Sequence, residues 1–123
     1  MILVGRLVDR IFAWALLILG LVHCAFTPIA YARWSIEAIW FLSAGLALIF
    51  AGMLNLLRIA YNAVAPGTRA ASLLANVLLL SLTVGIAGAV TLRNNPQVIV
   101  AGVIVVVELF FSLLRRDVTV AAP

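Results

Sequence analysis

Four long apolar stretches are the feature of this sequence that most constrains its fold. They occupy residues 11–30, 38–57, 70–92 and 98–114 of a 123-residue chain. A helix of about 20 apolar residues is long enough to cross the hydrocarbon core of a bilayer. A soluble domain of this length has no interior large enough for a composition that is 67% hydrophobic. The sequence therefore predicts an all-α integral membrane protein.

The connections between the stretches are short and contain turn-forming residues. Pro66-Gly67 interrupts the second connection and Asn94-Asn95-Pro96 the third. Short connections make consecutive helices antiparallel neighbours. We expect a single domain over residues 1–123, an up-down-up-down four-helix bundle with helices at about 11–30, 36–60, 69–92 and 97–115.

The distribution of basic residues predicts the orientation in the membrane. All eight are arginines, and only Arg33 and Arg93 fall on one side of a four-pass chain. The other six fall on the side that holds both termini: Arg6, Arg10, Arg58, Arg69, Arg115 and Arg116. By the positive-inside rule both termini are cytoplasmic. The net charge of +4 follows from this asymmetry, and no basic patch interleaved with aromatic residues indicates nucleic-acid binding.

The only histidine, His23, lies inside the first apolar stretch, roughly 10 Å below its outer end at 1.5 Å per residue. Thr27 shares its helix face, and Trp34 and Glu37 are expected at the same outer level. Ionisable groups within a membrane usually face the bundle interior or a water-filled cavity. These four residues are therefore candidates for an outward-opening ligand pocket. Alternatively, His23 makes only a helix-packing hydrogen bond, and Glu37 is stabilised by a helix N-terminus and by Arg33.

A second polar level is expected toward the cytoplasm. Asn76 and Glu108 each lie about 10 Å from the inner end of their helices, and Asn55 and Arg58 approach from the second helix. One interpretation is a structural lock, with Glu108 reaching toward Arg58 or Arg115. The other is a site that couples protons or cations to transport.

Small residues recur at helix-contact spacing. Ala44-Gly45 is followed seven residues later by Ala51-Gly52, and Ser81, Gly85 and Ala89 recur every four residues. Such spacing lets membrane helices approach closely. The contacts could lie within one chain or between the chains of a homodimer, and the sequence leaves both open.

No catalytic or metal-binding motif is present. One histidine without a second nearby ligand makes a poor metal site, and the chain has no zinc-binding pair, nucleophile elbow or phosphate loop. The sequence therefore predicts no metal site and specifies no other cofactor. It leaves open whether the protein is an enzyme.

The run Gly20-Leu21-Val22-His23, followed by Thr27-Pro28, Ile39-Trp40-Phe41 and Gly45, resembles small four-helix DoxX-like bacterial membrane proteins. The resemblance covers the first two predicted helices. It implies a bundle in a bacterial inner membrane and assigns no catalytic role to any residue. Small multidrug transporters also have four helices and a similar length, but their signature carboxylate lies within the first helix, whereas Asp9 is expected to precede it.

Three function hypotheses follow. The first is a small inner-membrane protein that binds an amphipathic or lipid-like ligand, or that serves as an accessory subunit of a larger membrane complex. The second is a dimeric proton-coupled transporter with Glu108 or Glu37 as the coupling carboxylate. The third is a membrane enzyme that acts on a lipid or quinone, with His23 as acid or base.

Overall fold

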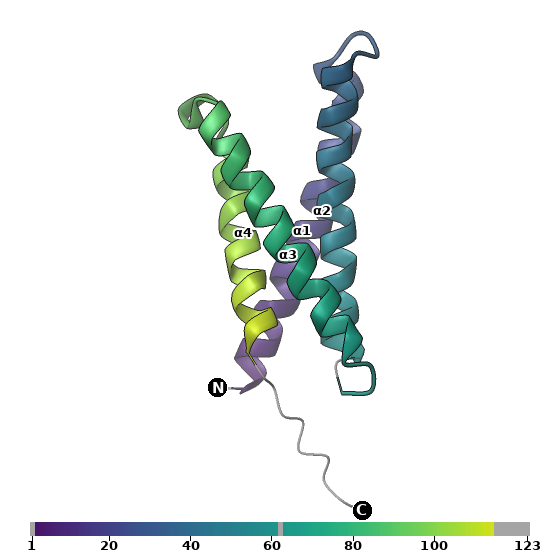
Figure 1. Cartoon of the computed structure of the whole chain (residues 1–123), viewed down its shortest axis with the longest axis vertical. Coiled ribbons are helices and arrows are strands. Elements are labelled where there is room, and N and C mark those ends of the chain that lie inside the picture. Colours follow the sequence, from purple (N-terminus) through teal and green to yellow (C-terminus); the bar gives the residue numbers. More distant parts are fainter. Residues whose placement is uncertain (1, 62, 115–123) are drawn as a thin grey trace, which may run out of the picture.

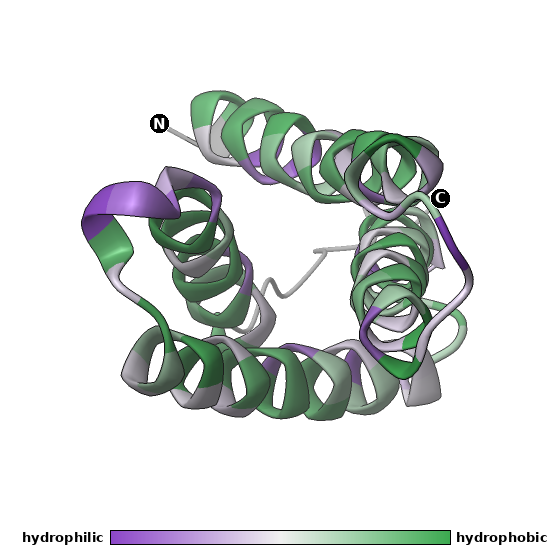
Figure 2. Ribbon diagram, turned by 90° about the horizontal axis from the view of Figure 1, so that it is seen from above, coloured by the Kyte–Doolittle hydropathy of each residue, from purple (hydrophilic) through white to green (hydrophobic). Residues whose placement is uncertain are grey.

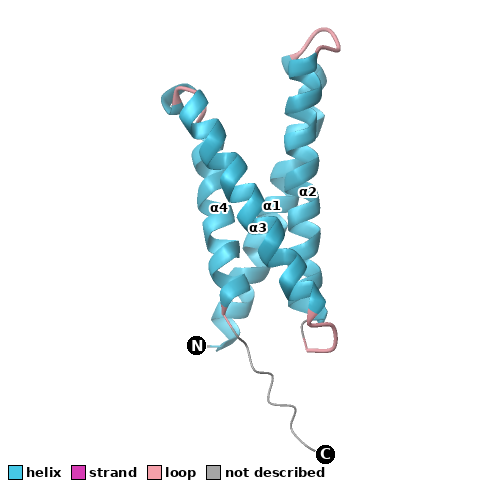
Figure 3. Ribbon diagram, in the orientation of Figure 1, coloured by secondary structure: helices cyan, strands magenta, loops and turns pink. Residues whose placement is uncertain are grey.

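The computed structural model describes residues 2–61 and 63–114, and these form four long helices joined by short connections (Figures 1 and 3). The helices are α1 (Ile2–Ala30), α2 (Ile36–Tyr61), α3 (Gly67–Ala89) and α4 (Pro96–Leu113), with a short 3-10 helix, η1 (Leu92–Asn94), before α4. No strand occurs in the described ranges. The predicted all-α four-helix bundle is confirmed. By length and composition all four helices can cross a membrane, so the chain is an integral membrane protein.

Helix α1 begins at Ile2 and not near residue 11, where the sequence analysis placed its start. The charged residues before residue 11 predict a flanking segment outside the helix, but Asp9 is buried together with Ala13, Leu16 and Gly20. These residues follow one another at spacings of four, three and four, which places them on one face of a helix. With 29 residues, α1 is roughly 43 Å long at 1.5 Å per residue. It is 11 residues longer than α4, which has 18 residues.

The predicted end of the first helix at Ala30 and the predicted start of the second at Ile36 agree with the structure, whereas the remaining helix ends differ by a few residues. α3 starts at Gly67 and stops at Ala89, because the backbone becomes extended at Val90; η1 follows at Leu92–Asn94. α4 starts at Pro96, which occupies the first turn, where a missing N–H costs no hydrogen bond. The predicted end of the fourth helix at residue 115 lies outside the described residues.

Helices α1 and α2 pack so closely that their glycines have no room for a side chain. A Cβ atom on Gly20 would lie 2.7 Å from the Gly45 carbonyl oxygen, and one on Gly52 would lie 2.8 Å from the backbone nitrogen of Leu17. The small residues of α2 thus serve packing within one chain. α1 and α2 make the most extensive helix pair in the bundle.

The small residues of α3 do not pack in this way. Ser81, Gly85 and Ala89 are all exposed, and a Cβ atom on Gly85 would meet nothing within 4 Å. Among the described residues, α3 has no buried position after Thr83 and α4 has none before Ile104. The α1–α2 and α3–α4 hairpins accordingly diverge toward the ends that carry the α1–α2 and α3–α4 connections (Figure 1).

Hydrophobic residues run along the outer surface of all four helices, and hydrophilic residues gather in the connections (Figure 2). The two hairpins come together where α1 and α3 begin and α2 and α4 end. We call this the basic end, because four described arginines lie there: Arg6, Arg10, Arg58 and Arg69. The other end, with the α1–α2 and α3–α4 connections, is the opposite end.

Candidate functional site

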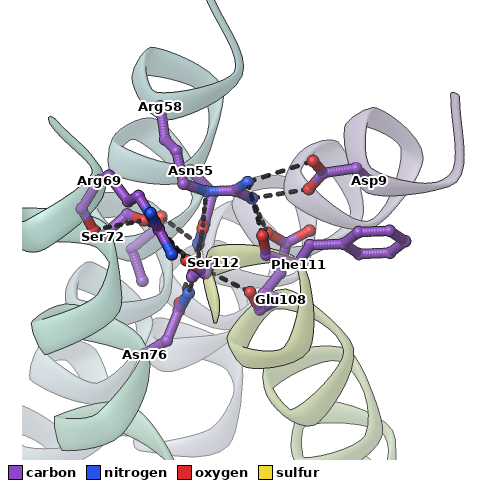
Figure 4. Close-up of polar contacts among 10 residues, drawn as sticks. Asp9, Asn55, Arg58, Arg69, Ser72, Asn76, Glu108, Phe111 and Ser112 are labelled. Carbon is purple, nitrogen blue, oxygen red and sulfur yellow. Dashed lines mark hydrogen bonds and ion pairs between the residues drawn. The ribbon is translucent and has the colours of Figure 1, made fainter. Parts of the chain in front are cut away.

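At the basic end, a cluster of buried polar side chains joins all four helices (Figure 4). We call it the polar cluster; its members are Asp9 of α1, Asn55 and Arg58 of α2, Ser72 and Asn76 of α3, and Glu108 and Ser112 of α4. Depth in the predicted helices indicates four of these residues: Asn55, Arg58, Asn76 and Glu108. The structure brings those four together.

Arg58 is the centre of the polar cluster. Its Nη1 donates to Oδ2 of Asp9 at 3.2 Å, and its Nη2 donates to Oδ1 at 2.6 Å. This is a bidentate ion pair, in which the planar guanidinium matches the carboxylate. Nη2 also donates to Oε2 of Glu108 at 3.1 Å. Nε donates to Oδ1 of Asn55 and Nη1 to the carbonyl oxygen of Phe111, each at 3.4 Å. Arg58 therefore links α1, α2 and α4 through one side chain that is only 5% exposed.

Two asparagines connect this arginine to α3. Asn55 Nδ2 donates to Asn76 Oδ1 at 2.8 Å, and Asn76 Nδ2 donates back to Asn55 Oδ1 at 3.0 Å. Asn76 Nδ2 also donates to the Ser112 hydroxyl at 2.9 Å, and that hydroxyl lies 3.3 Å from the Ser72 hydroxyl. The two side-chain amides thus satisfy each other's hydrogen bonds without water, and such pairing is how polar groups are tolerated inside a membrane bundle.

Glu108 is the least satisfied member of the polar cluster. It is 0% exposed. Its Oε2 accepts the bond from Arg58, but its Oε1 has no hydrogen-bond partner among the described residues. A buried ionised carboxylate is costly unless it is paired and hydrogen-bonded. Glu108 and Asp9, which is 1% exposed, share the guanidinium of Arg58.

A cavity of about 510 Å³ opens beside the polar cluster at the basic end. This volume falls within the roughly 300–1,000 Å³ typical of small-molecule sites. We call it the basic pocket. Its charged lining consists of Asp9 and four arginines, Arg6, Arg10, Arg58 and Arg69, and its apolar lining includes Leu7, Phe111 and Leu114.

The four arginines differ in how they are engaged. Arg58 is held by carboxylates, and Arg69 donates to the carbonyl oxygens of Ser112 and Leu113 at the end of α4, at 2.9 and 2.7 Å. Arg6 and Arg10 are exposed. Neither forms an ion pair or side-chain hydrogen bond with another residue of the described part of the chain. The lining of the basic pocket therefore includes two exposed guanidinium groups that have no ion-pair partner among residues 2–61 and 63–114.

At the opposite end the predicted outer pocket is not assembled as a polar site. His23 stacks face to face on Phe41, with ring centroids 3.8 Å apart and an interplanar angle of 16°. Its Nε2 is buried and has no hydrogen-bond partner in the described ranges. The hydroxyl of Thr27 donates to the backbone carbonyl of His23 at 3.2 Å. Aromatic packing between α1 and α2 thus accounts for the position of His23.

The other two predicted residues of that pocket point elsewhere. Trp34 is 74% exposed in the α1–α2 connection. Glu37 is exposed in the first turn of α2 and hydrogen-bonds with the Ser35 side chain, whose hydroxyl also accepts a bond from the Ala38 N–H. Glu37 forms no ion pair with His23 or with any other described residue. Its surroundings are those of a helix N-terminus.

Hydropathy and depth along the predicted helices do not indicate Asp9, Ser72 or the pocket arginines Arg6 and Arg10 as site residues. The statement that Asp9 precedes the first helix is wrong, because α1 extends to Ile2. The spacing of four residues between Asp9 and Ala13 is consistent with one helix face. However, a charged residue next to an apolar stretch usually indicates that the membrane-spanning helix does not extend past it. The contrast with small multidrug transporters that rested on Asp9 lying outside the first helix therefore does not hold.

No three His, Cys, Asp or Glu side chains come together as a metal site within residues 2–61 and 63–114. Comparison with known proteins adds no identity, since no family model, no curated protein and no solved structure matches this chain.

Proposed function

We propose that this protein binds an amphipathic ligand with an anionic headgroup in the basic pocket. The observation that carries the proposal is a cavity of about 510 Å³ with four arginines and one carboxylate in its lining. Arginine is the side chain best suited to phosphate and carboxylate groups, because its planar donors match their oxygens. Apolar residues such as Leu7 and Leu114 in the same lining suit the part of the ligand that continues into the bilayer.

The location proposed for the protein agrees with this ligand. We propose a bacterial inner membrane, in line with the DoxX-like resemblance, with both termini and the basic pocket on the cytoplasmic side. Six of the eight arginines in the sequence support that orientation. The cytoplasmic leaflet carries anionic lipids, and each arginine near its surface contributes about 1 kcal/mol to their attraction.

Native mass spectrometry of the protein released from nanodiscs tests the proposal. The nanodiscs contain phosphatidylcholine mixed with phosphatidylglycerol, and the measurement is the ratio of the two lipids retained. Replacing Arg6 and Arg10 together by Gln removes two guanidinium groups without breaking an ion pair or side-chain hydrogen bond among the described residues. At about 1 kcal/mol each, the preference for phosphatidylglycerol should fall about 30-fold.

The matched control replaces Arg33 and Arg93 by Gln. Both residues are exposed at the opposite end, and the change in net charge is the same. This variant should retain phosphatidylglycerol as the wild type does. An equal loss in both variants would mean that net charge, and not the basic pocket, selects the lipid, and the proposal would be abandoned.

A dimeric proton-coupled transporter is the second candidate function. It is favoured by the exposed stripe of Ser81, Gly85 and Ala89, whose spacing suits close helix approach between chains, and by the buried Glu108. The same mass spectrum reports the number of chains. A monomer in that spectrum removes this candidate and leaves ligand binding or an accessory role in a larger complex.

A further inference from the structure

The polar cluster and the basic pocket share one side chain, Arg58. Its guanidinium holds Asp9 and Glu108, and the same residue lines the cavity. Glu108 is absent from the lining, so a ligand in the pocket can contact Arg58 but not the Glu108 carboxylate. A negative charge placed next to Arg58 therefore reduces the stabilisation that its guanidinium gives to ionised Glu108.

The charged groups around Glu108 come from every neighbouring helix. α1 contributes Asp9, and Arg6 and Arg10 at the pocket edge; α2 contributes Arg58; α3 contributes Arg69, which is held by carbonyl oxygens at the end of α4. Of the described groups, only Arg58 donates a hydrogen bond to the Glu108 carboxylate. The positive charge of Arg58 is thus the main direct compensation for an ionised Glu108.

We propose that Glu108 binds an exchangeable proton and that an anionic headgroup in the basic pocket promotes its uptake. The headgroup brings negative charge to the guanidinium on which ionised Glu108 depends, so the protonated carboxyl becomes the favoured form. The proton comes from water at the basic end and is held on a Glu108 oxygen. No other bond is made or broken. The binding of a proton by Glu108 is inferred from its buried Oε1, which has no hydrogen-bond partner among the described residues. The effect of the anionic headgroup rests on the proposed function.

Linkage makes the effect reciprocal, because a ligand that favours the protonated state is bound more tightly by that state. Coupling of this kind typically changes affinity by about 5- to 150-fold. The wild-type protein should therefore retain an anionic lipid more weakly as the pH rises through the titration of Glu108. Glu108→Gln, which mimics the neutral carboxyl, should bind with an affinity that no longer depends on pH over that range.

Infrared spectroscopy of ¹³C-glutamate-labelled protein measures the proton directly. The sequence contains two glutamates, Glu37 and Glu108, so Glu37→Gln leaves Glu108 as the only labelled carboxyl. Because Glu37 is exposed and far from the polar cluster, this variant also serves as the control. At a pH well above about 4.3, the ordinary pKa of an exposed glutamate, a labelled band of a protonated carboxyl that is present in Glu37→Gln and absent in Glu108→Gln is the expected result. A Glu108 that stays ionised at every pH at which the protein is folded overturns the proposal.

The effect of the anionic headgroup on proton uptake is tested by repeating the infrared titration in three nanodisc samples. One contains phosphatidylcholine alone, one contains phosphatidylcholine with added inorganic phosphate, and one contains phosphatidylglycerol. The band should persist to higher pH with phosphatidylglycerol if the phosphate group belongs to a lipid, and also with inorganic phosphate if the free anion suffices. If phosphatidylglycerol is retained by mass spectrometry but the titration is the same in all three samples, the linkage is refuted while the proposed function stands. If no sample shows retained anion, the proposed function fails, and with it the linkage.

Discussion

Replacing Gly52 by Ala tests the close approach of α1 and α2 with a single methyl group. The added Cβ would lie 2.8 Å from both the Cβ and the backbone nitrogen of Leu17, and 2.9 Å from its Cα. Ordinary van der Waals contact begins at 3.4 Å, and two of these three atoms belong to the backbone. The clash cannot be relieved by rotating a side chain, so the two helices must separate locally by roughly half an ångström.

The expected cost follows from that separation. Forcing an extra methyl into a packed interface typically costs about 1–3 kcal/mol, and a gap of 0.5–1 Å already removes about a quarter to a half of each neighbouring dispersion contact. The gain in helix propensity from Gly to Ala, at most about 1 kcal/mol, offsets only part of this. We expect Gly52→Ala to be less stable than the wild type by about 1–2 kcal/mol, measured by steric trapping in bicelles.

Gly85→Ala is the matched control, because a Cβ at Gly85 meets no atom within 4 Å. The same chemical change there should leave the stability of the monomer unchanged or raise it by up to about 1 kcal/mol. Equal stabilities of the two alanine variants would refute the reasoning, since the difference between them depends only on what surrounds each glycine.

Two further substitutions test the polar cluster by the same measurement. Arg58→Met removes the guanidinium shared by two buried carboxylates and should cost about 3–5 kcal/mol; the loss should shrink when Glu108→Gln is added, and a loss unchanged by that second substitution would contradict the ion-pair account. Asn76→Ala removes hydrogen bonds that join three helices and should cost about 1–2 kcal/mol, whereas Ser81→Ala, whose hydroxyl bonds only within its own helix, should cost almost nothing.

The position of each polar residue along its helix was predictable, but its partners were not. Asn55, Asn76 and Glu108 could be assigned to one level because depth in a membrane helix is simply residue number multiplied by a fixed rise. The same arithmetic placed His23 and Glu37 at a common level at the opposite end. Their side chains do not meet. Depth could not reveal this, because it says nothing about the direction in which a side chain leaves its helix.

Helix boundaries explain the residues that were missed. Hydropathy locates a helix by its apolar run, so it assigns the charged turns at the start of α1 to a flanking segment and leaves Asp9 out of the polar cluster. A helix can continue beyond the apolar run when its charges are exposed, as Arg6 and Arg10 are, or neutralised, as Asp9 is by Arg58. The partner that neutralises Asp9 is 49 residues away in the sequence, and no local pattern reveals it.

The helix count and the membrane class follow from the amino-acid sequence, because an apolar run of spanning length has few other ways to satisfy its backbone. The gathering of most arginines on one side of the membrane also follows from it. Helix packing is needed to show which small residues are buried within the chain, at Gly20, Gly45 and Gly52, and which stay exposed, at Gly85. It alone decided that Arg58 serves both Asp9 and Glu108 and lines the basic pocket. The physical reason is that periodicity fixes what a single helix can bury, whereas rotation and crossing of helices fix which buried groups meet.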